Sequence, residues 1–141
     1  MPAPKLAPGR TLAEAEAKAA LAAHGLDCPR SHRAANANDA AASAQSIGFP
    51  VVVKGEGIAH KTEAGAVALN LRDADAVIRA ADAMPATSFL VEEMVGGAVA
   101  ELLVGVVADP AHGLVLTLGA GGITSEMLKD TDSLLLPVDA A

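Results

Sequence analysis

The sequence has almost no aromatic side chains. Its 141 residues contain no tryptophan and no tyrosine, and Phe49 and Phe89 are the two phenylalanines. Hydrophobic residues still make up 52% of the chain, so its core must be packed from small aliphatic side chains. Proteins that hold single-stranded nucleic acids stack the bases on aromatic rings, and this composition argues against that function.

Cysteine is equally scarce. Cys28 is the one cysteine, so the chain cannot form an internal disulfide, and no cysteine and histidine cluster has the spacing of a zinc site. The proline-containing start, residues 1–9, lacks the apolar stretch of a signal peptide. The longest apolar runs, such as 102–108, are too short to span a membrane. We therefore expect a cytoplasmic protein without a membrane partner.

Basic side chains are in the minority. Ten lysines and arginines stand against 17 aspartates and glutamates, which gives a net charge of −7. This charge repels a phosphate backbone, so nucleic acid is excluded as a general partner. A chain of this length can bury the core of one domain but not of two.

The order of the predicted elements favours an α+β fold. Helices are expected at about 12–24, 39–47 and 73–84, the first beginning at a capping box formed by Thr11 and Glu14. Short β-branched or apolar runs predict strands at 50–54, 66–71, 89–95, 100–108 and 114–118. Because the last three strands follow one another closely, we expect a largely antiparallel sheet with flanking helices.

Two segments carry side chains that could bind an anion such as phosphate or react with it. Lys54 follows three valines, and a charge so close to a buried strand must reach either solvent or an anion such as phosphate. Both outcomes are equally open. The glycine-containing loop 55–65 places His60 beside Lys61, an imidazole that could act as a nucleophile beside a cation that could stabilise anionic oxygens. A solvated hairpin tip is the commoner outcome for such a pair.

Two further segments could hold a ligand through backbone groups and carboxylates. Glu92 and Glu93 end one predicted strand and Glu101 begins the next. Backbone groups at a strand end can read an adenine edge, and a carboxylate can accept both ribose hydroxyls. The glycine-rich segment 119–122 lets backbone approach a ligand closely. Surface glutamates and a tight turn are the simpler interpretations, so the residues alone leave both open.

In their order and spacing, these segments resemble the ATP-grasp domain of the NDP-forming acyl-CoA synthetases, the family of the ADP-forming acetate-CoA ligases. The resemblance covers about residues 12–138 and rests on the segments 47–54, 60–65, 91–95, 101–109 and 119–137. It implies an ATP-grasp-like domain over residues 11–141, after a flexible N-terminal segment of residues 1–10.

The resemblance also implies roles for individual residues. Lys54 matches the lysine that contacts the nucleotide phosphates, Val95 a backbone contact to adenine, and Glu101 the ribose carboxylate. The remaining residues of the implied nucleotide site are Lys61, Glu92 and Glu93. His60 matches a mobile-loop histidine that carries phosphoryl between sites. The implied reaction moves phosphoryl between ATP or ADP and an acyl substrate through phosphohistidine and couples it to formation of a CoA thioester.

One part of the family pattern is missing. The family continues into a segment whose acidic residue and Asn-Pro pair hold Mg²⁺, whereas this chain stops at Ala141 and has its asparagines at positions 36, 38 and 70. We therefore expect no metal ligand in this chain, a domain incomplete at its C-terminal end, and no activity of the isolated chain. CoA and the acyl substrate would bind to other domains or to a partner subunit.

Two alternatives to this ligase hypothesis stay open. One is a non-catalytic nucleotide-sensing module of a larger protein. The other is a truncated lobe that binds no nucleotide and whose exposed sheet edge drives association into a homo-oligomer.

Overall fold

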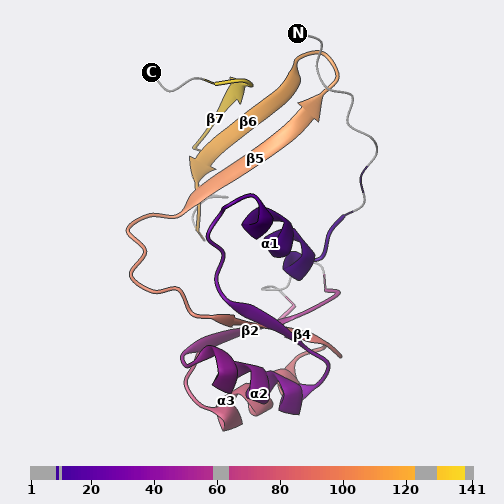
Figure 1. Cartoon of the computed structure of the whole chain (residues 1–141), viewed down its shortest axis with the longest axis vertical. Coiled ribbons are helices and arrows are strands. Elements are labelled where there is room, and N and C mark those ends of the chain that lie inside the picture. Colours follow the sequence, from indigo (N-terminus) through magenta and orange to yellow (C-terminus); the bar gives the residue numbers. More distant parts are fainter. Residues whose placement is uncertain (1–8, 10, 59–63, 123–129, 139–141) are drawn as a thin grey trace. The chain divides into compact units, whose positions relative to one another are not determined.

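The computed structural model of the chain describes residues 9, 11–58, 64–122 and 130–138 (Figure 1). These residues form two compact units, one from Thr11 to Gly96 and one made of Gly9 and the described residues from Gly97 on. The segment predicted to be flexible, residues 1–10, lies outside the described residues except for Gly9.

The first unit is a four-stranded sheet with helices. Its elements in chain order are α1 (Glu14–Ala23), β1 (Ser31–Ala34), α2 (Ala37–Ile47), β2 (Val51–Gly55), β3 (Val67–Leu71), α3 (Ala74–Ala83) and β4 (Phe89–Glu93). The strands lie in the order β1-β4-β2-β3, and each neighbouring pair is antiparallel. The predicted α+β class and antiparallel pairing are therefore confirmed.

The two faces of this sheet have different neighbours. Side chains alternate between the faces of a strand, and Val51, Val53, Phe89 and Val91 pack with α2 and α3 into the core. Val52 and Lys54 of β2 therefore lie on the other face with Leu90 and Glu92 of β4. In Figure 1, α1 lies on that side of β2 and β4, and α2 and α3 lie on the opposite side.

The core is aliphatic, as the composition predicts. Helix α2 buries Ala40, Ala41, Ala44 and Ile47 against the sheet. The starts of both core helices follow local capping: the Asn36 side chain accepts the amide of Asp39 at 2.9 Å, and Asp73 accepts the amide of Ala76 at 2.7 Å. The longest described helix has 11 residues, and none that the structure describes has the length and apolar character to cross a membrane.

Helix α1 differs from its prediction at its start. It begins at Glu14 rather than at residue 12, and its N-cap residue is Ala13, whose amide donates to Glu16 Oε2 at 3.1 Å. The capping box predicted for Thr11 and Glu14 is therefore wrong. The carboxylate of Glu14 instead contacts Lys54, 40 residues further along the chain.

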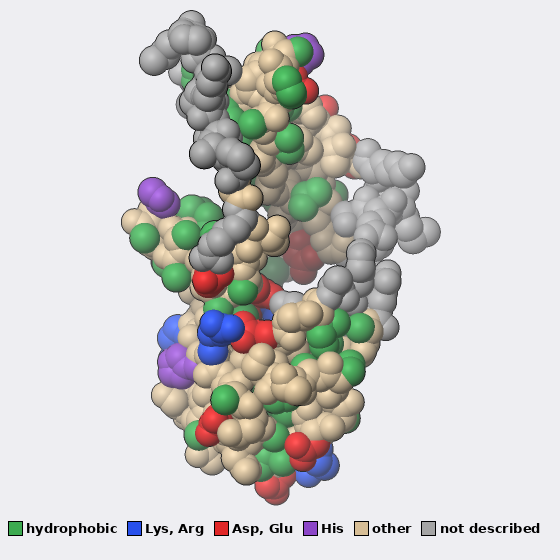
Figure 2. Space-filling model, turned by 90° about the vertical axis from the view of Figure 1, so that its right-hand side faces the viewer, with side chains coloured by type: hydrophobic (Ala, Val, Ile, Leu, Met, Phe, Trp, Pro, Cys, Tyr) green, Lys and Arg blue, Asp and Glu red, His purple; other side chains and the backbone are tan. Residues whose placement is uncertain are grey.

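The second unit is a three-stranded antiparallel sheet in the order β5-β6-β7. Its strands are β5 (Leu102–Asp109), β6 (Gly113–Ala120) and β7 (Thr131–Leu135). The register places Val106 opposite Leu116 and Leu116 opposite Leu134, so these residues share one face. Val104 and Val106 on that face are 61% and 56% exposed, and green apolar side chains are visible on the surface of this unit in Figure 2.

Candidate functional site

Four charged side chains meet on the α1 side of the first sheet. Lys54 Nζ lies 2.5 Å from Glu14 Oε1 and 3.0 Å from Glu92 Oε2, and Lys18 Nζ contacts Glu92 Oε1. We call Glu14, Lys18, Lys54 and Glu92 the Lys54 cluster. Glu14 and Lys18 are four residues apart and so share one face of α1. Lys54 and Glu92 come from neighbouring strands, which are paired so that Val52 lies opposite Glu92.

The Lys54 cluster is partly buried and electrically balanced. Glu92 is 5% exposed, and Lys18 Nζ and Glu92 Oε2 are inaccessible to solvent. The side chains of Lys54 and Glu14 are 23% and 30% exposed. Two ammonium groups face two carboxylates, which is the arrangement that buried charges require.

The cluster keeps Lys54 positively charged. Burial lowers the pKa of Lys54, but hydrogen bonds to Glu14 and Glu92 and the charges of both carboxylates raise it more, so that it lies above the ordinary value of 10.5. The two outcomes left open for Lys54 were solvent and an external anion. In this structure its anionic partners are carboxylates of the chain itself.

Glu93 does not share the surroundings of Glu92. Its carboxylate accepts the backbone amide of Arg30 at 3.1 Å and the Arg30 Nε–H at 2.6 Å. Hydrogen bonds from the side chain and backbone of Arg30 hold the pKa of Glu93 below its ordinary value. Val95, two residues further on, lies beyond the end of β4 and is 61% exposed.

A residue that sequence reasoning missed lies beside the Lys54 cluster. Glu56 follows β2 directly, and its Oε2 accepts the Nε–H of Arg33 at 2.9 Å. Glu56 and Glu14 both line a cavity of about 390 Å³ whose other described lining residues are Thr11, Leu12, Ala13, Gly57 and Ile58. Lys18 was missed as well. Lys18 lies in an alanine-rich segment without a motif. Glu56 lies in the loop 55–65, where the sequence drew attention to His60 and Lys61 instead.

In the second unit, Glu101 lies against the glycine-rich segment. The amide of Gly121 donates to the carbonyl of Glu101 at 2.8 Å. A Cβ on Gly121 would lie 3.0 Å from the Glu101 carbonyl carbon, and one on Gly122 would lie 2.8 Å from Glu101 Oε2. Gly122 also has a φ of +83°, which favours glycine. The predicted approach of this segment to a ligand stays a prediction, and in the structure the close neighbour of both glycines is Glu101.

Two predicted site residues, His60 and Lys61, lie outside the described residues. Within the ranges that the structure describes, no group of three or more histidine, cysteine, aspartate or glutamate side chains could hold a metal ion. Both carboxylates of the Lys54 cluster already bind ammonium groups.

Comparison with known sequences gives a family match along nearly the whole chain. Residues 6–141 match a family described as the ATP-grasp domain. A trans-feruloyl-CoA synthase from an unknown prokaryotic organism is 39% identical over 140 residues, which are 91% of this chain and 20% of that protein. The β subunit of ADP-forming acetate-CoA ligase II from Pyrococcus furiosus is 32% identical over 146 residues, which are 94% of this chain and 62% of that protein. The chain thus spans about a fifth and about three fifths of these curated relatives.

Solved structures of one archaeal protein share the fold. The dinucleotide-forming acetyl-coenzyme A synthetase 1 of Candidatus Korarchaeum cryptofilum, in complex with coenzyme A, Ca-AMPCP and HgCl⁺, matches with a TM-score of 0.81 and 28% identity. The match covers 91% of this chain and 61% of that one. Another structure of that protein, with coenzyme A and Mg-AMPPCP, has its phosphohistidine segment pointing towards the nucleotide-binding site. It matches with a TM-score of 0.67 and 26% identity over 89% of this chain and 57% of that one.

Proposed function

Because this chain belongs to the ATP-grasp domain family, we propose that it is the nucleotide-binding part of an ADP-forming acyl-CoA synthetase. The predicted ATP-grasp-like fold and the family resemblance are confirmed by the family match and by the solved structures. The named relatives are CoA ligases and synthases, which favours this function over a non-catalytic nucleotide sensor. The activity, substrates and partners of the complete protein are part of the proposal.

The observation that carries the proposal is the charge of Lys54. Its ammonium is held at the end of a buried strand, on the sheet face that α2 and α3 leave uncovered. Its pKa lies above 10.5, so it carries a positive charge throughout the neutral range. A cation fixed in this way is suited to bind the oxygens of a nucleotide phosphate. Glu92, which contacts it at 3.0 Å, positions the ammonium.

The remaining predicted binding residues receive separate roles in the proposal. Val95 follows β4 and its exposure leaves room for an adenine ring beside it. Glu101 is exposed and directly precedes β5, where its carboxylate can accept the ribose hydroxyls. Glu93 keeps Arg30 in place and so supports the end of β4. Lys61 would add a second cation near the phosphates.

His60 is the proposed phosphoryl carrier. Its loop joins β2 to β3, which are neighbouring antiparallel strands, and the loop starts directly after Lys54 and Gly55. The imidazole nitrogen attacks the terminal phosphorus of ATP and ADP leaves. The phosphoryl group then passes to the carboxylate of the acyl substrate, and the CoA thiol displaces phosphate to give the thioester.

Magnesium and the other reactants complete the proposal. Mg²⁺ would neutralise charge on the transferring phosphoryl group, and its protein ligands would lie outside the described residues. CoA and the acyl substrate would bind through other domains or a partner subunit, in the cytoplasm.

The test is nucleotide binding by the full-length protein with Lys54→Met. We expect the Kd for ADP, measured by calorimetry, to rise by about 10- to 100-fold, because a charged hydrogen bond contributes about 1.5 to 3 kcal/mol. Arg79→Met is the matched control, since it removes one positive charge from an exposed position on α3. An unchanged Kd for Lys54→Met would place the phosphates elsewhere and overturn the proposal.

A further inference from the structure

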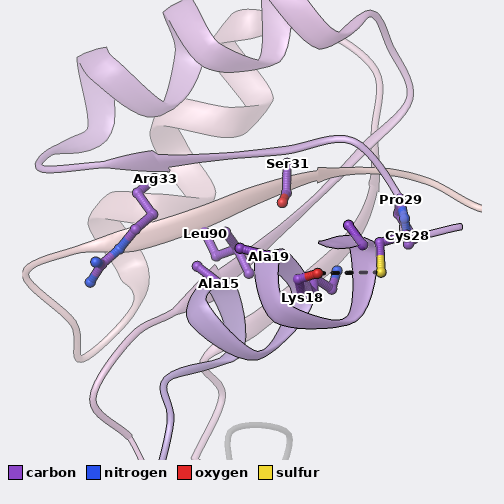
Figure 3. A pocket seen from close by; sticks show the side chains of 9 residues that line it. Ala15, Lys18, Ala19, Cys28, Pro29, Ser31, Arg33 and Leu90 are labelled. Carbon is purple, nitrogen blue, oxygen red and sulfur yellow. Dashed lines mark hydrogen bonds between the residues drawn. The ribbon is translucent and has the colours of Figure 1, made fainter. Parts of the chain in front are cut away.

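Helix α1 is attached to its sheet differently from the other two helices. No residue of α1 is buried, whereas α2 buries four residues and α3 buries Val77 and Ala81. A cavity of about 310 Å³ is lined by Ala15 and Ala19 of α1 and by Leu90 of β4 (Figure 3). Because alanine side chains do not fill this space, apolar packing holds α1 only weakly.

Two ion pairs connect this helix to the sheet instead. Glu14 in its first turn contacts Lys54 of β2, and Lys18 one turn later contacts Glu92 of β4. The second pair is the more buried of the two, because Lys18 Nζ is inaccessible to solvent and the Glu14 side chain is 30% exposed. Breaking the pair at Lys18 would leave a buried charge without a partner, which is costly. Breaking the pair at Glu14 costs less, because solvent reaches both partners.

Glu14 balances the charge of the Lys54 cluster. Without Glu14, two ammonium groups would share the single carboxylate of Glu92, and this sheet face would carry one excess positive charge. Such a face attracts an anion. A carboxylate oxygen and a phosphate oxygen are equivalent acceptors for an ammonium group. Glu14 Oε1, at 2.5 Å, therefore occupies a position on Lys54 that a phosphate oxygen could take.

We propose that Glu14 sets the nucleotide affinity of this domain by competing with the nucleotide phosphate for Lys54, so that the first turn of α1 leaves the sheet when the phosphate binds. The inference rests on the proposed function of Lys54. The Lys18 to Glu92 pair stays intact and holds the rest of the helix. Weak packing makes the movement possible, since segments with few buried apolar contacts open at low cost.

The first test is ADP binding by the full-length protein with Glu14→Gln, which keeps the shape of the side chain and removes its charge. We expect the Kd to fall about fivefold, because the competing charge is gone while Lys54 and Glu92 remain. Asp75→Asn is the matched control, because it removes one negative charge from the first turn of α3. Its Kd should stay within about twofold of that of the unmodified protein.

The second test is hydrogen exchange of the α1 amides. In the unmodified protein, saturating ADP should speed exchange of the Ala17 amide, which donates to the Ala13 carbonyl in the first turn of α1. Glu14→Gln should show the faster exchange before ADP is added. A purely structural role of Glu14 predicts the opposite result, since ADP would then leave α1 unchanged or protect it.

The results separate this inference from the proposed function. If Lys54→Met weakens ADP binding and Glu14→Gln leaves the Kd unchanged or raises it, competition by Glu14 is wrong and the role of Lys54 stands. If Lys54→Met has no effect on the Kd, both are wrong.

Discussion

Lys54 Nζ lies 3.0 Å from Glu92 Oε2, across the neighbouring strands β2 and β4. The lysine would be costly to bury alone, and so would the glutamate, which is 5% exposed. Together they form a charged pair on the sheet face that the hydrophobic core does not use. This relationship gives the domain a cation of fixed position, which is what recognition of a phosphate needs.

Gly55→Ala should lower the stability of the first unit. A Cβ at this position would lie 2.8 Å from Ala86 Cβ and 3.3 Å from Ala66 Cβ. Neither neighbouring atom can rotate away, because a Cβ is fixed by its backbone, so we expect a loss of about 1 to 3 kcal/mol in the free energy of unfolding. Urea denaturation measures it. Gly96→Ala is the control, since nothing lies within 4 Å of its added Cβ, and equal stability of the two variants would contradict the crowding at Gly55.

The Glu93 carboxylate should contribute to the free energy of unfolding at neutral pH, and this contribution should disappear in acid. The pKa of Glu93 is lowered in the folded state by the hydrogen bonds from Arg30. Its contribution is therefore complete above the ordinary value of 4.5 and is lost as the pH falls through the folded value. Denaturation of the unmodified protein and of Glu93→Gln should give different free energies of unfolding at neutral pH that converge in acid. A difference that is constant with pH would show that the ion pair does not cause it.

His60→Ala should stop acyl-CoA synthesis by the full-length protein and leave the Kd for ADP nearly unchanged. The proposed carrier acts in phosphoryl transfer and not in recognition of adenine or ribose, so only transfer is lost. Thioester formation and calorimetry measure the two properties. His112→Ala, in the turn between β5 and β6, is the control, and near-normal synthesis by His60→Ala would remove His60 from the mechanism.

Lys61→Ala should raise the Kd for ADP less than Lys54→Met does. Lys54 is held in place by Glu14 and Glu92. The sequence predicts that Lys61 lies on a glycine-containing loop, and ordering such a loop would cost part of the binding energy. Calorimetry of both variants of the full-length protein measures the difference. An equal rise in the Kd for ADP in both variants would show that the two lysines contribute equally to binding.

The 141-residue chain by itself should release no ADP from ATP. Phosphoryl transfer needs metal ions in fixed positions, and among the described residues no cluster of three or more histidine, cysteine, aspartate or glutamate side chains is found. Steady-state ADP release measures this, with the full-length protein as the positive control. ADP release that scales with the concentration of the purified chain would contradict the expectation.

Local sequence patterns were enough to predict most of the elements. Helices α2 and α3 lie within two residues of their predicted bounds. Asn36 and Asp73 cap them, and each cap contacts an amide only three residues further along the chain. Strands β2, β3, β4, β5 and β6 lie within two residues of the runs that predicted them. Strands β1 and β7 were missed. Their residues are mostly polar or exposed, and pairing with a neighbouring strand rather than an apolar pattern makes them strands.

The sequence by itself determined the small aliphatic core, the antiparallel α+β class, and a lysine at the end of a buried strand, because each follows from composition or from residues close together in the chain. Tertiary structure alone decided the partners of that lysine. Glu14 precedes Lys54 by 40 residues and looked like a capping residue. Glu92 and Glu93 are adjacent and looked alike, but the alternation of the strand turns one toward Lys54 and the other toward Arg30. Charge pairing across a sheet depends on strand register and on which helix covers which face, and neither can be predicted from residues that are close together in the sequence.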